Sequence, residues 1–267
     1  MRDRRQLLQV AAIAIVASAI GIAIALSIDW FPQAASTKAH EIDTLFDWTL
    51  VASVPIFVLV MTVAIYSVWR FRARPGDMSD GAPIHGNARL EVVWVLVPFI
   101  IVSVLAGYAW WVLNDIEKPQ PNEMRVNAIG QQFAWSFTYP QAGNFTSKEL
   151  VLPVNRPVYF YVSTKDVIHS FWVPGFRLKY DAVPGITTKL HVTPDRIGRY
   201  EVICAELCGL GHSTMRQTVR VVSPQDFDAW KARTASAAKG TASASGAGTI
   251  SPNSDSLASV GGGGNTR

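Results

Sequence analysis

The stretch Cys204-Ala-Glu-Leu-Cys208-Gly-Leu-Gly-His212-Ser-Thr-Met215 places two thiols, an imidazole and a thioether within twelve residues, and its cysteines are the only two in the chain. Soft donors packed this closely favour a thiophilic transition metal, with copper ahead of zinc because of the methionine. A structural zinc site and a disulfide between Cys204 and Cys208 are the alternatives that the stretch alone leaves open.

Alternating apolar and polar residues flank this stretch and fill the chain from residue 124 to 222. Short alternating runs broken by Pro and Gly are typical of antiparallel β-sandwiches or barrels. The predicted strands lie at 125–129, 133–139, 157–162, 188–192, 199–203 and 217–221. Cys204 then follows a strand directly, and a second histidine, His169, lies at the end of the 157–162 region. One early histidine and one late ligand loop are similar to the arrangement in cupredoxins.

The chain before residue 116 is apolar enough to lie in a membrane. Only 16% of the 267 residues are charged, against ~25% in a soluble domain. Apolar segments at 45–69 and 92–113 are each long enough to span a bilayer, which predicts a transmembrane helical hairpin over residues 40–116. Arginines at 70, 72 and 74 place the connecting loop on the cytoplasmic side and the chain after residue 114 outside. An apolar hairpin buried in a soluble protein is the alternative.

Residues 1–36 have the form of a further spanning helix or of a signal peptide. A basic start is followed by an apolar run from about residue 7 to 28 and by small residues near 34–36. The run is longer than the ~7–15 residues of a signal-peptide core, which favours a retained helix and leaves cleavage open.

The chain after the metal-binding stretch changes texture twice. Ser223 followed by Pro224 predicts a short helix that ends near residue 232 and closes a copper domain over residues 122–232. Residues 233–267 are rich in Ala, Ser and Gly and are predicted to be a disordered tail. The net charge of +4 comes with no basic-aromatic patch, so a nucleic-acid partner is excluded.

Two cysteines in one loop allow two thiolates to bridge two copper ions, whereas a blue copper site uses a single thiolate. Redox-inert zinc would need neither Met215 nor the flanking aromatic residues. The residues therefore predict an electron-transfer centre.

The spacing Cys204-x3-Cys208-x3-His212-x2-Met215, with Asp166-x2-His169 upstream, resembles the dinuclear copper (CuA) motif of subunit II of haem-copper cytochrome c oxidases. The resemblance runs from about residue 43 to 230 and includes Asn87-x2-Leu-Glu91-x2-Trp94 at the start of the last spanning segment. It implies a membrane-anchored all-β protein, in which a transmembrane helical hairpin precedes a cupredoxin-like Greek-key β-sandwich.

The resemblance also implies roles for individual residues. The copper ligands would be His169, Cys204, the backbone carbonyl of Glu206, Cys208, His212 and Met215. The side chain of Glu206 would face a Mg or Mn site shared with the catalytic subunit, and Glu91 would lie at the mouth of a proton-uptake channel. Electrons would enter at Phe133 and Trp135. His40, His85 and His191 are expected to be ordinary surface or strand residues.

One departure concerns the side of the protein that receives electrons. The family commonly reads Gln-Trp-Tyr-Trp where this chain has Gln132-Phe133-Ala134-Trp135, so an indole N–H is lost. The acidic docking residues that often follow are absent, and residues 115–233 carry a net charge of +3. A strongly basic cytochrome c would be steered poorly to this face, which predicts a donor of lower positive charge or a membrane-tethered one.

These observations predict subunit II of a proton-pumping cytochrome c oxidase in a bacterial-type plasma membrane, with its copper domain outside. Its partners would be the catalytic haem-copper subunit, other oxidase subunits and a cytochrome c. No Cys-x2-Cys-His follows the copper domain, so a fused c-type haem is excluded. The alternatives are the CuA subunit of another terminal reductase, such as a nitric oxide reductase, and a membrane-anchored copper-binding module.

Overall fold

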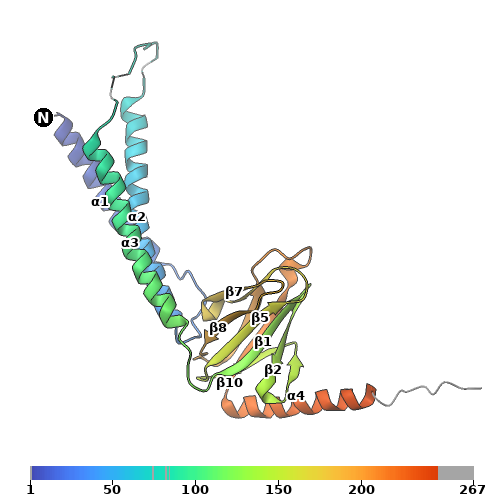
Figure 1. Cartoon of the computed structure of the whole chain (residues 1–267). Coiled ribbons are helices and arrows are strands. Elements are labelled where there is room, and N and C mark those ends of the chain that lie inside the picture. Colours follow the sequence, from blue (N-terminus) through green and yellow to red (C-terminus); the bar gives the residue numbers. More distant parts are fainter. Residues whose placement is uncertain (1, 74, 82, 84, 246–267) are drawn as a thin grey trace, which may run out of the picture.

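The computed structural model describes residues 2–245 apart from 74, 82 and 84, and within them long helices lead into a β-sandwich (Figure 1). The helices are α1 (Arg2–Ser27), α2 (Ala39–Phe71) and α3 (Ala88–Ile116). Each contains a stretch long and apolar enough to cross a membrane. Most of their large apolar side chains are exposed, as lipid-facing surfaces require. The predicted helical hairpin is confirmed, and the apolar segment before it, expected to be a spanning helix or a signal peptide, is helical.

The ends of the spanning helices have distinct local causes. Asn87 caps α3, because its Oδ1 accepts from the backbone N–H groups of Arg89 (3.2 Å) and Leu90 (3.3 Å). Helix α2 has 33 residues, about 50 Å at ~1.5 Å per residue. It is therefore longer than the ~30 Å hydrocarbon layer, and part of it extends beyond the membrane.

The sandwich consists of two five-stranded sheets. The first has the order β3-β2-β1-β5-β8 and the second the order β4-β10-β9-β6-β7. The strands are β1 (Met124–Gln131), β2 (Ala134–Tyr139), β3 (Phe145–Ser147), β4 (Leu150–Pro153), β5 (Val158–Thr164), β6 (His169–Val173), β7 (Leu178–Ala182), β8 (Thr188–Val192), β9 (Gly198–Cys204) and β10 (Arg216–Val222). All six predicted strands are present, and β3, β4, β6 and β7 were not predicted.

Two details of the predicted sandwich are wrong. Strands β1 and β5 pair in parallel, as do β4 and β10, so the sheets are mixed and not wholly antiparallel. His169 does not lie at the end of the 157–162 strand. It begins β6, which belongs to the other sheet. The chain crosses from one sheet to the other between residues 164 and 169, and this crossing brings His169 beside β9.

The core between the sheets is aromatic and fully buried. Trp135, Phe137, Phe160 and Phe171 have at most 2% of their surface exposed, and Phe171 packs against each of the other three rings. Burial of such large rings dominates core energetics, and here it fixes β2, β5 and β6 around one point.

The chain after the last strand forms a long helix, α4 (Pro224–Ser245), along one end of the sandwich (Figure 1). Ser223 caps it, because its Oγ accepts from the N–H of Asp226 at 3.1 Å. Trp230 packs against Tyr139 and Phe145 with ring centroids 5.2 and 5.4 Å apart. The prediction of a disordered tail from residue 233 is therefore wrong as far as Ser245, since the Ala-rich sequence continues the helix. Residues 246–267 lie outside the described residues.

The connection between α1 and α2 is attached to the sandwich. The backbone N–H of Ala35 donates to Gly175 O (2.8 Å), and that of Thr37 donates to Thr193 O (3.0 Å). Ser36 Oγ donates to Phe176 O at 3.0 Å. The small residues near 34–36, which the sequence marked as a cleavage site of a signal peptide, include Ala35 and Ser36, both buried.

Candidate metal centre

The predicted metal-binding stretch connects β9 to β10 as one closed loop. Cys204 is the last residue of β9, and Arg216 begins β10. The N–H of Cys204 donates to Met215 O at 3.1 Å, which closes the loop at its base. Cys204 is also in register with Phe171 on β6. The strand pairing therefore holds both ends of the loop beside the start of β6, where His169 lies.

Sulfur and nitrogen donors converge within this loop. Cys204 Sγ lies 3.9 Å from Cys208 Sγ and 3.8 Å from His169 Nδ1. Cys208 Sγ lies 3.7 Å from His212 Nδ1 and 3.8 Å from Met215 Sδ. The potential ligand atoms of His169, Cys204 and Cys208 all lie within 4.8 Å of one another. Donors at such separations can share one small metal centre.

The donor set fits copper better than the alternatives considered from sequence. Both cysteines are free, so the structure does not contain the disulfide. Two thiols with a thioether are soft ligands that suit copper. The carbonyl oxygen of Glu206 lies 3.3 Å from Cys204 Sγ and adds an oxygen donor to the same cluster. His169 and Met215 are fully buried and both cysteines nearly so, which gives a closed site.

Burial also affects the protonation of the Cys208 thiol. Burial, followed by the charge and hydrogen bond of Cys204, raises the pKa of the Cys208 thiol to about 11. The thiol is therefore neutral at pH 7 without a metal. Because thiolate is the form that binds metal, binding must release protons.

Asp166 orients the ring of His169 from the side opposite the sulfur atoms. Its Oδ1 lies 2.8 Å from His169 Nε2, so Nδ1 of the same ring is left to face Cys204. Burial alone would raise the pKa of Asp166. The hydrogen bonds from the N–H of Gln132, from His169 and from the N–H of Val167 outweigh it, and the pKa lies well below its usual range. Asp166 is thus a carboxylate that fixes the orientation of the ring.

Gln132 connects the two segments that carry the donors. Its backbone N–H donates to Asp166 Oδ2 at 2.7 Å, and its side-chain Nε2 donates to Cys208 O at 2.6 Å. The turn between β1 and β2 is thereby bonded both to the segment before His169 and to the ligand loop. No pattern in the sequence predicts this role.

The two aromatic residues expected to receive electrons lie in different environments. The ring of Phe133 lies against the backbone of the ligand loop, because a Cβ added to Gly211 would be 2.5 Å from Phe133 Cγ. Phe133 is 40% exposed, whereas Trp135 is 1% exposed. Trp135 packs edge-on against the ring of His169 with centroids 6.0 Å apart. Only Phe133 of this pair can therefore touch a partner protein.

Exposed apolar side chains occur in the ligand loop, in the segment before His169 and in the turn between β1 and β2. They are Phe133, Val167, Ile168, Leu207 and Leu210, and they are called the apolar rim below. Exposed apolar side chains next to a functional site are candidates for a protein–protein contact.

The other residues singled out from sequence lie apart from the cluster or at its edge. The side chain of Glu206 is exposed. Glu91 lies in the first turn of α3, where its Oε1 accepts from the N–H of Asn87 at 3.1 Å. His40 and His85 are exposed. His191 pairs with Glu123 at 2.6 Å and stacks on Tyr159.

Comparison with known proteins shows which family the chain matches and which proteins are similar to it. Residues 22–112 match the family described as the transmembrane domain of cytochrome c oxidase subunit II, and residues 145–222 match its periplasmic domain. Cytochrome c oxidase subunit 2 of Synechocystis sp. is 33% identical, over 82% of this chain and 82% of its own length. That of Thermostichus vulcanus is 35% identical, over 75% and 77%. Among solved structures, the periplasmic domain of subunit II of cytochrome oxidase of Bradyrhizobium japonicum is 31% identical. It covers 43% of this chain and 95% of its own, with a TM-score of 0.42.

Proposed function

Because the chain belongs to the cytochrome c oxidase subunit II family of haem-copper terminal oxidases, we propose that it is the subunit that takes electrons from a cytochrome c and passes them to haem in the catalytic subunit. The observation that carries the proposal is the convergence of two thiols, two imidazoles and a thioether at donor separations of 3.7–3.9 Å.

The residues that would hold a dinuclear copper centre (CuA) are those of the cluster. They are His169, Cys204, the carbonyl of Glu206, Cys208, His212 and Met215. When bound, the copper pair supplies one-electron redox chemistry at a potential that the protein sets. Asp166 keeps Nδ1 of His169 directed at the sulfurs, and Gln132 holds the loop against that segment. Ligands fixed in this way move little, as fast electron transfer requires.

Electrons would enter through the apolar rim. Phe133 lies at the surface over the backbone of the ligand loop. A haem edge in contact with Phe133 would therefore be separated from that loop only by the phenyl ring. Trp135, buried against His169, would support that histidine from inside and not touch the donor. Since the rim is apolar and the domain carries a net charge of +3, turnover with the natural donor should depend weakly on salt. A steep fall in turnover with a strongly basic cytochrome c as salt is added would contradict this part.

Two carboxylates would serve the partner subunit. The side chain of Glu206, exposed beside the cluster, would face a Mg or Mn site shared with the catalytic subunit. Glu91 would lie at the mouth of a proton-uptake channel of a proton-pumping complex. Glu91 is in the first turn of α3, at the end of this spanning helix that lies away from the sandwich (Figure 1). This position supports the assignment. The arginines at 70 and 72 lie on the same side, so by the positive-inside rule the sandwich would be extracytoplasmic in a bacterial-type plasma membrane.

The test is a spectrum of the purified full chain after addition of copper. We expect about two copper ions per chain, a purple colour and a seven-line EPR signal from one electron shared by both ions. Cys208→Ser should abolish the shared-electron signal and leave the circular dichroism of the sandwich unchanged. A colourless zinc protein or a one-copper blue spectrum would overturn the copper assignment.

Two alternative functions can be distinguished from this proposal, one by the reaction of the purified complex and the other by the rate of metal release. A CuA subunit of a nitric oxide reductase would give the same spectrum, and the purified complex would then reduce nitric oxide and not oxygen. A copper-binding module that delivers metal would release copper readily to a chelator. The burial of His169, Cys204, Cys208 and Met215 favours slow release.

A further inference from the structure

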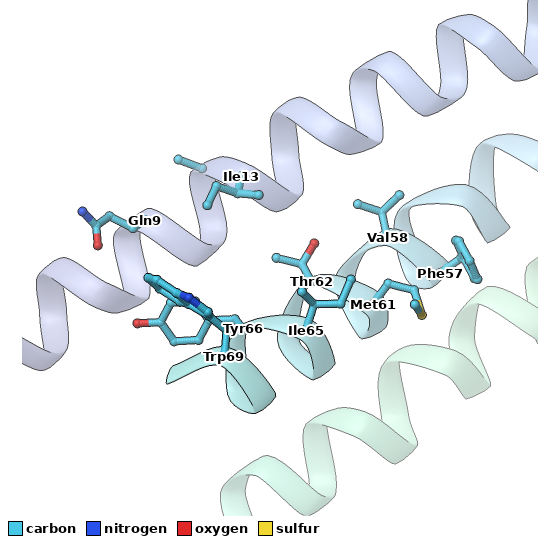
Figure 2. A pocket seen from close by; sticks show the side chains of 10 residues that line it. Gln9, Ile13, Phe57, Val58, Met61, Thr62, Ile65, Tyr66 and Trp69 are labelled. Atoms are coloured by element: carbon cyan, nitrogen blue, oxygen red, sulfur yellow. The ribbon is translucent and has the colours of Figure 1, made fainter. Parts of the chain in front are cut away.

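Helices α1 and α2 enclose a groove that the electron-transfer function does not use. It has a volume of about 690 Å³. Gln9, Ala12 and Ile13 on α1 line it together with residues of α2 between Phe57 and Trp69. Figure 2 shows Val58 and Thr62 pointing toward α1, and Phe57 and Met61 on the flank of α2 that is turned away from α1. The lining is almost wholly apolar, and the polar groups of Gln9 and Tyr66 lie at one end of it with the indole of Trp69 (Figure 2).

The groove occupies only the half of the helix pair that lies farther from the sandwich. Toward the sandwich the helices come together, because a Cβ added to Gly21 would be 2.9 Å from Val54 Cγ1. The lining on α2 runs from Phe57 to Trp69, about 18 Å at ~1.5 Å per residue. One leaflet of the hydrocarbon layer is ~15 Å deep. The groove therefore has the length of a lipid acyl chain in one leaflet, whereas a partner's spanning helix would need a seat across both.

We expect the polar end of the groove to lie at the level of the lipid headgroups. Tyr66 and Trp69 are there, and amphipathic rings settle at the membrane surface. Arg5 lies one turn before Gln9 on the same face of α1, and Arg72 follows Trp69 by three residues at the end of α2. Both arginines are exposed.

The charge around this end is positive. Residues 2–5 contain three arginines and one aspartate, and residues 70–72 contain two arginines. Basic side chains beside an apolar slot complement a phosphate group that has a hydrocarbon tail. This complementarity selects an anionic lipid over a zwitterionic one.

We propose that the groove binds an anionic phospholipid, with one acyl chain along α2 from Phe57 to Tyr66 and the headgroup phosphate between Arg5 and Arg72. The lipid fills the gap where α1 and α2 diverge and thereby joins the two helices in the leaflet opposite the sandwich. The site does not depend on the metal centre.

The test uses the full chain, purified in detergent, stripped of lipid and titrated with phosphatidylglycerol or phosphatidylcholine of the same acyl chains. Native mass spectrometry counts the bound lipid. The unmodified chain should retain one phosphatidylglycerol at concentrations several-fold below those needed for phosphatidylcholine. Arg5→Gln and Arg72→Gln should each weaken retention of phosphatidylglycerol about five-fold, the effect of one arginine beside an anionic headgroup. Arg89→Gln changes an exposed arginine at the start of α3, a helix that contributes no residue to the groove lining, and as the matched control it should have no effect.

A second pair of variants tests the apolar wall. Ala12 lines the groove, whereas its neighbour Ala11 does not. Ala12→Trp should fill the groove and abolish lipid retention, and Ala11→Trp should retain it, with matching circular dichroism for both. If Ala12→Trp fails to fold, the arginine series still decides the outcome. Equal retention of both lipids, retention unaffected by Ala12→Trp, or a second protein chain bound in place of the lipid would each overturn the proposal. So would a purified protein whose first residue lies beyond Ser27.

Discussion

At the scale of single residues, the metal centre depends on side chains that are not ligands. Gln132 bonds to Asp166 through its backbone and to Cys208 O through its side chain. Gln132→Ala keeps the first bond and removes the second, so the ligand loop loses a restraint while every donor remains. We expect copper to dissociate about 10–100-fold faster, as is usual when a partner of a ligand is removed. The measurement is the rate of copper transfer to a chelator, followed by EPR.

The matched control is Gln131→Ala, one residue earlier, where the side chain is exposed. It should bind and release copper like the unmodified chain. A Gln132→Ala protein with unchanged copper release and an unchanged EPR signal would show that the bond to Cys208 O does not restrain the loop.

Tyr139 connects the two sheets by one hydroxyl group. It donates to Val151 O (3.0 Å) and accepts from the N–H of Val151 (2.8 Å) on β4, an edge strand. Tyr139→Phe would leave both peptide groups buried and unpaired, which should cost about 1–3 kcal/mol. The check is the midpoint of denaturant unfolding, with Tyr159→Phe, on a half-buried tyrosine of β5, as the control.

The same tyrosine predicts a dependence on alkaline pH. Burial raises the pKa of Tyr139, with weaker opposition from its bond to Val151. A group whose pKa is raised by folding contributes stability below its ordinary pKa, ~10 for tyrosine, and loses that contribution as pH rises further. The stability advantage over Tyr139→Phe should therefore be full at pH 7–9 and shrink above pH 10. An advantage that stays constant to pH 11 would contradict the role of burial.

The metal donors could be predicted from sequence because they are close in the chain, whereas their supports could not. Four donors lie within twelve residues, and spacing alone brings them together. Asp166 is three residues before His169, which is a weak local signal. Gln132 is 76 residues from Cys208, and only the folded sheets bring the two into contact.

At the scale of elements, α4 is the clearest difference between expectation and structure. Low-complexity composition predicted disorder, yet Ala is the best helix former and the helix is anchored at its start by Phe227 and Trp230. Trp230→Ala should destabilise the sandwich by about 3–5 kcal/mol, as for other large-to-small core changes. Among the residues of α4 whose side chains the structure describes, Ala235 is the last that packs against the core. Ending the chain after Ala237 should therefore leave the unfolding midpoint unchanged. A truncated chain as unstable as Trp230→Ala would show that the far part of α4 stabilises the fold.

Some strands could be predicted from local sequence patterns, whereas others depend on contacts between distant parts of the chain. The six predicted strands have alternating apolar and polar residues, because each buries one face against the core and exposes the other. Strand β6 was missed because four of its five residues are buried, so its sequence does not alternate. The parallel pairing of β1 with β5 was missed because no short-range pattern reports which strands become neighbours.

At the scale of the whole molecule, an ion pair fixes the sandwich to the membrane helices. Arg177 Nε donates to Asp43 Oδ1 on α2 at 2.6 Å, and another guanidinium nitrogen donates to Pro32 O at 2.8 Å. Its side chain is 5% exposed. Arg177→Gln should weaken this junction by about 1–3 kcal/mol, the range for hydrogen bonds of charged groups. Hydrogen exchange of residues 29–38 should then be faster.

The control for the junction is Arg196→Gln, an exposed arginine on the sandwich. It should leave exchange of residues 29–38 unchanged, and neither variant should alter the copper spectrum. Equal exchange in the Arg177 and Arg196 variants would show that the backbone bonds of the linker hold the junction without the ion pair.

The linker from α1 to α2 also has a consequence for biosynthesis. Ser36 bonds to Phe176, 140 residues later in the chain. At ~5–20 residues per second, the ribosome needs roughly 7–28 s to make that partner. During this interval Ala35 and Ser36 have emerged and have no sandwich to cover them. Any peptidase that removes α1 must act in that window, because the finished fold buries both residues. The decision between an anchored and a processed amino terminus is therefore a race between cleavage and the folding of β7 and β8.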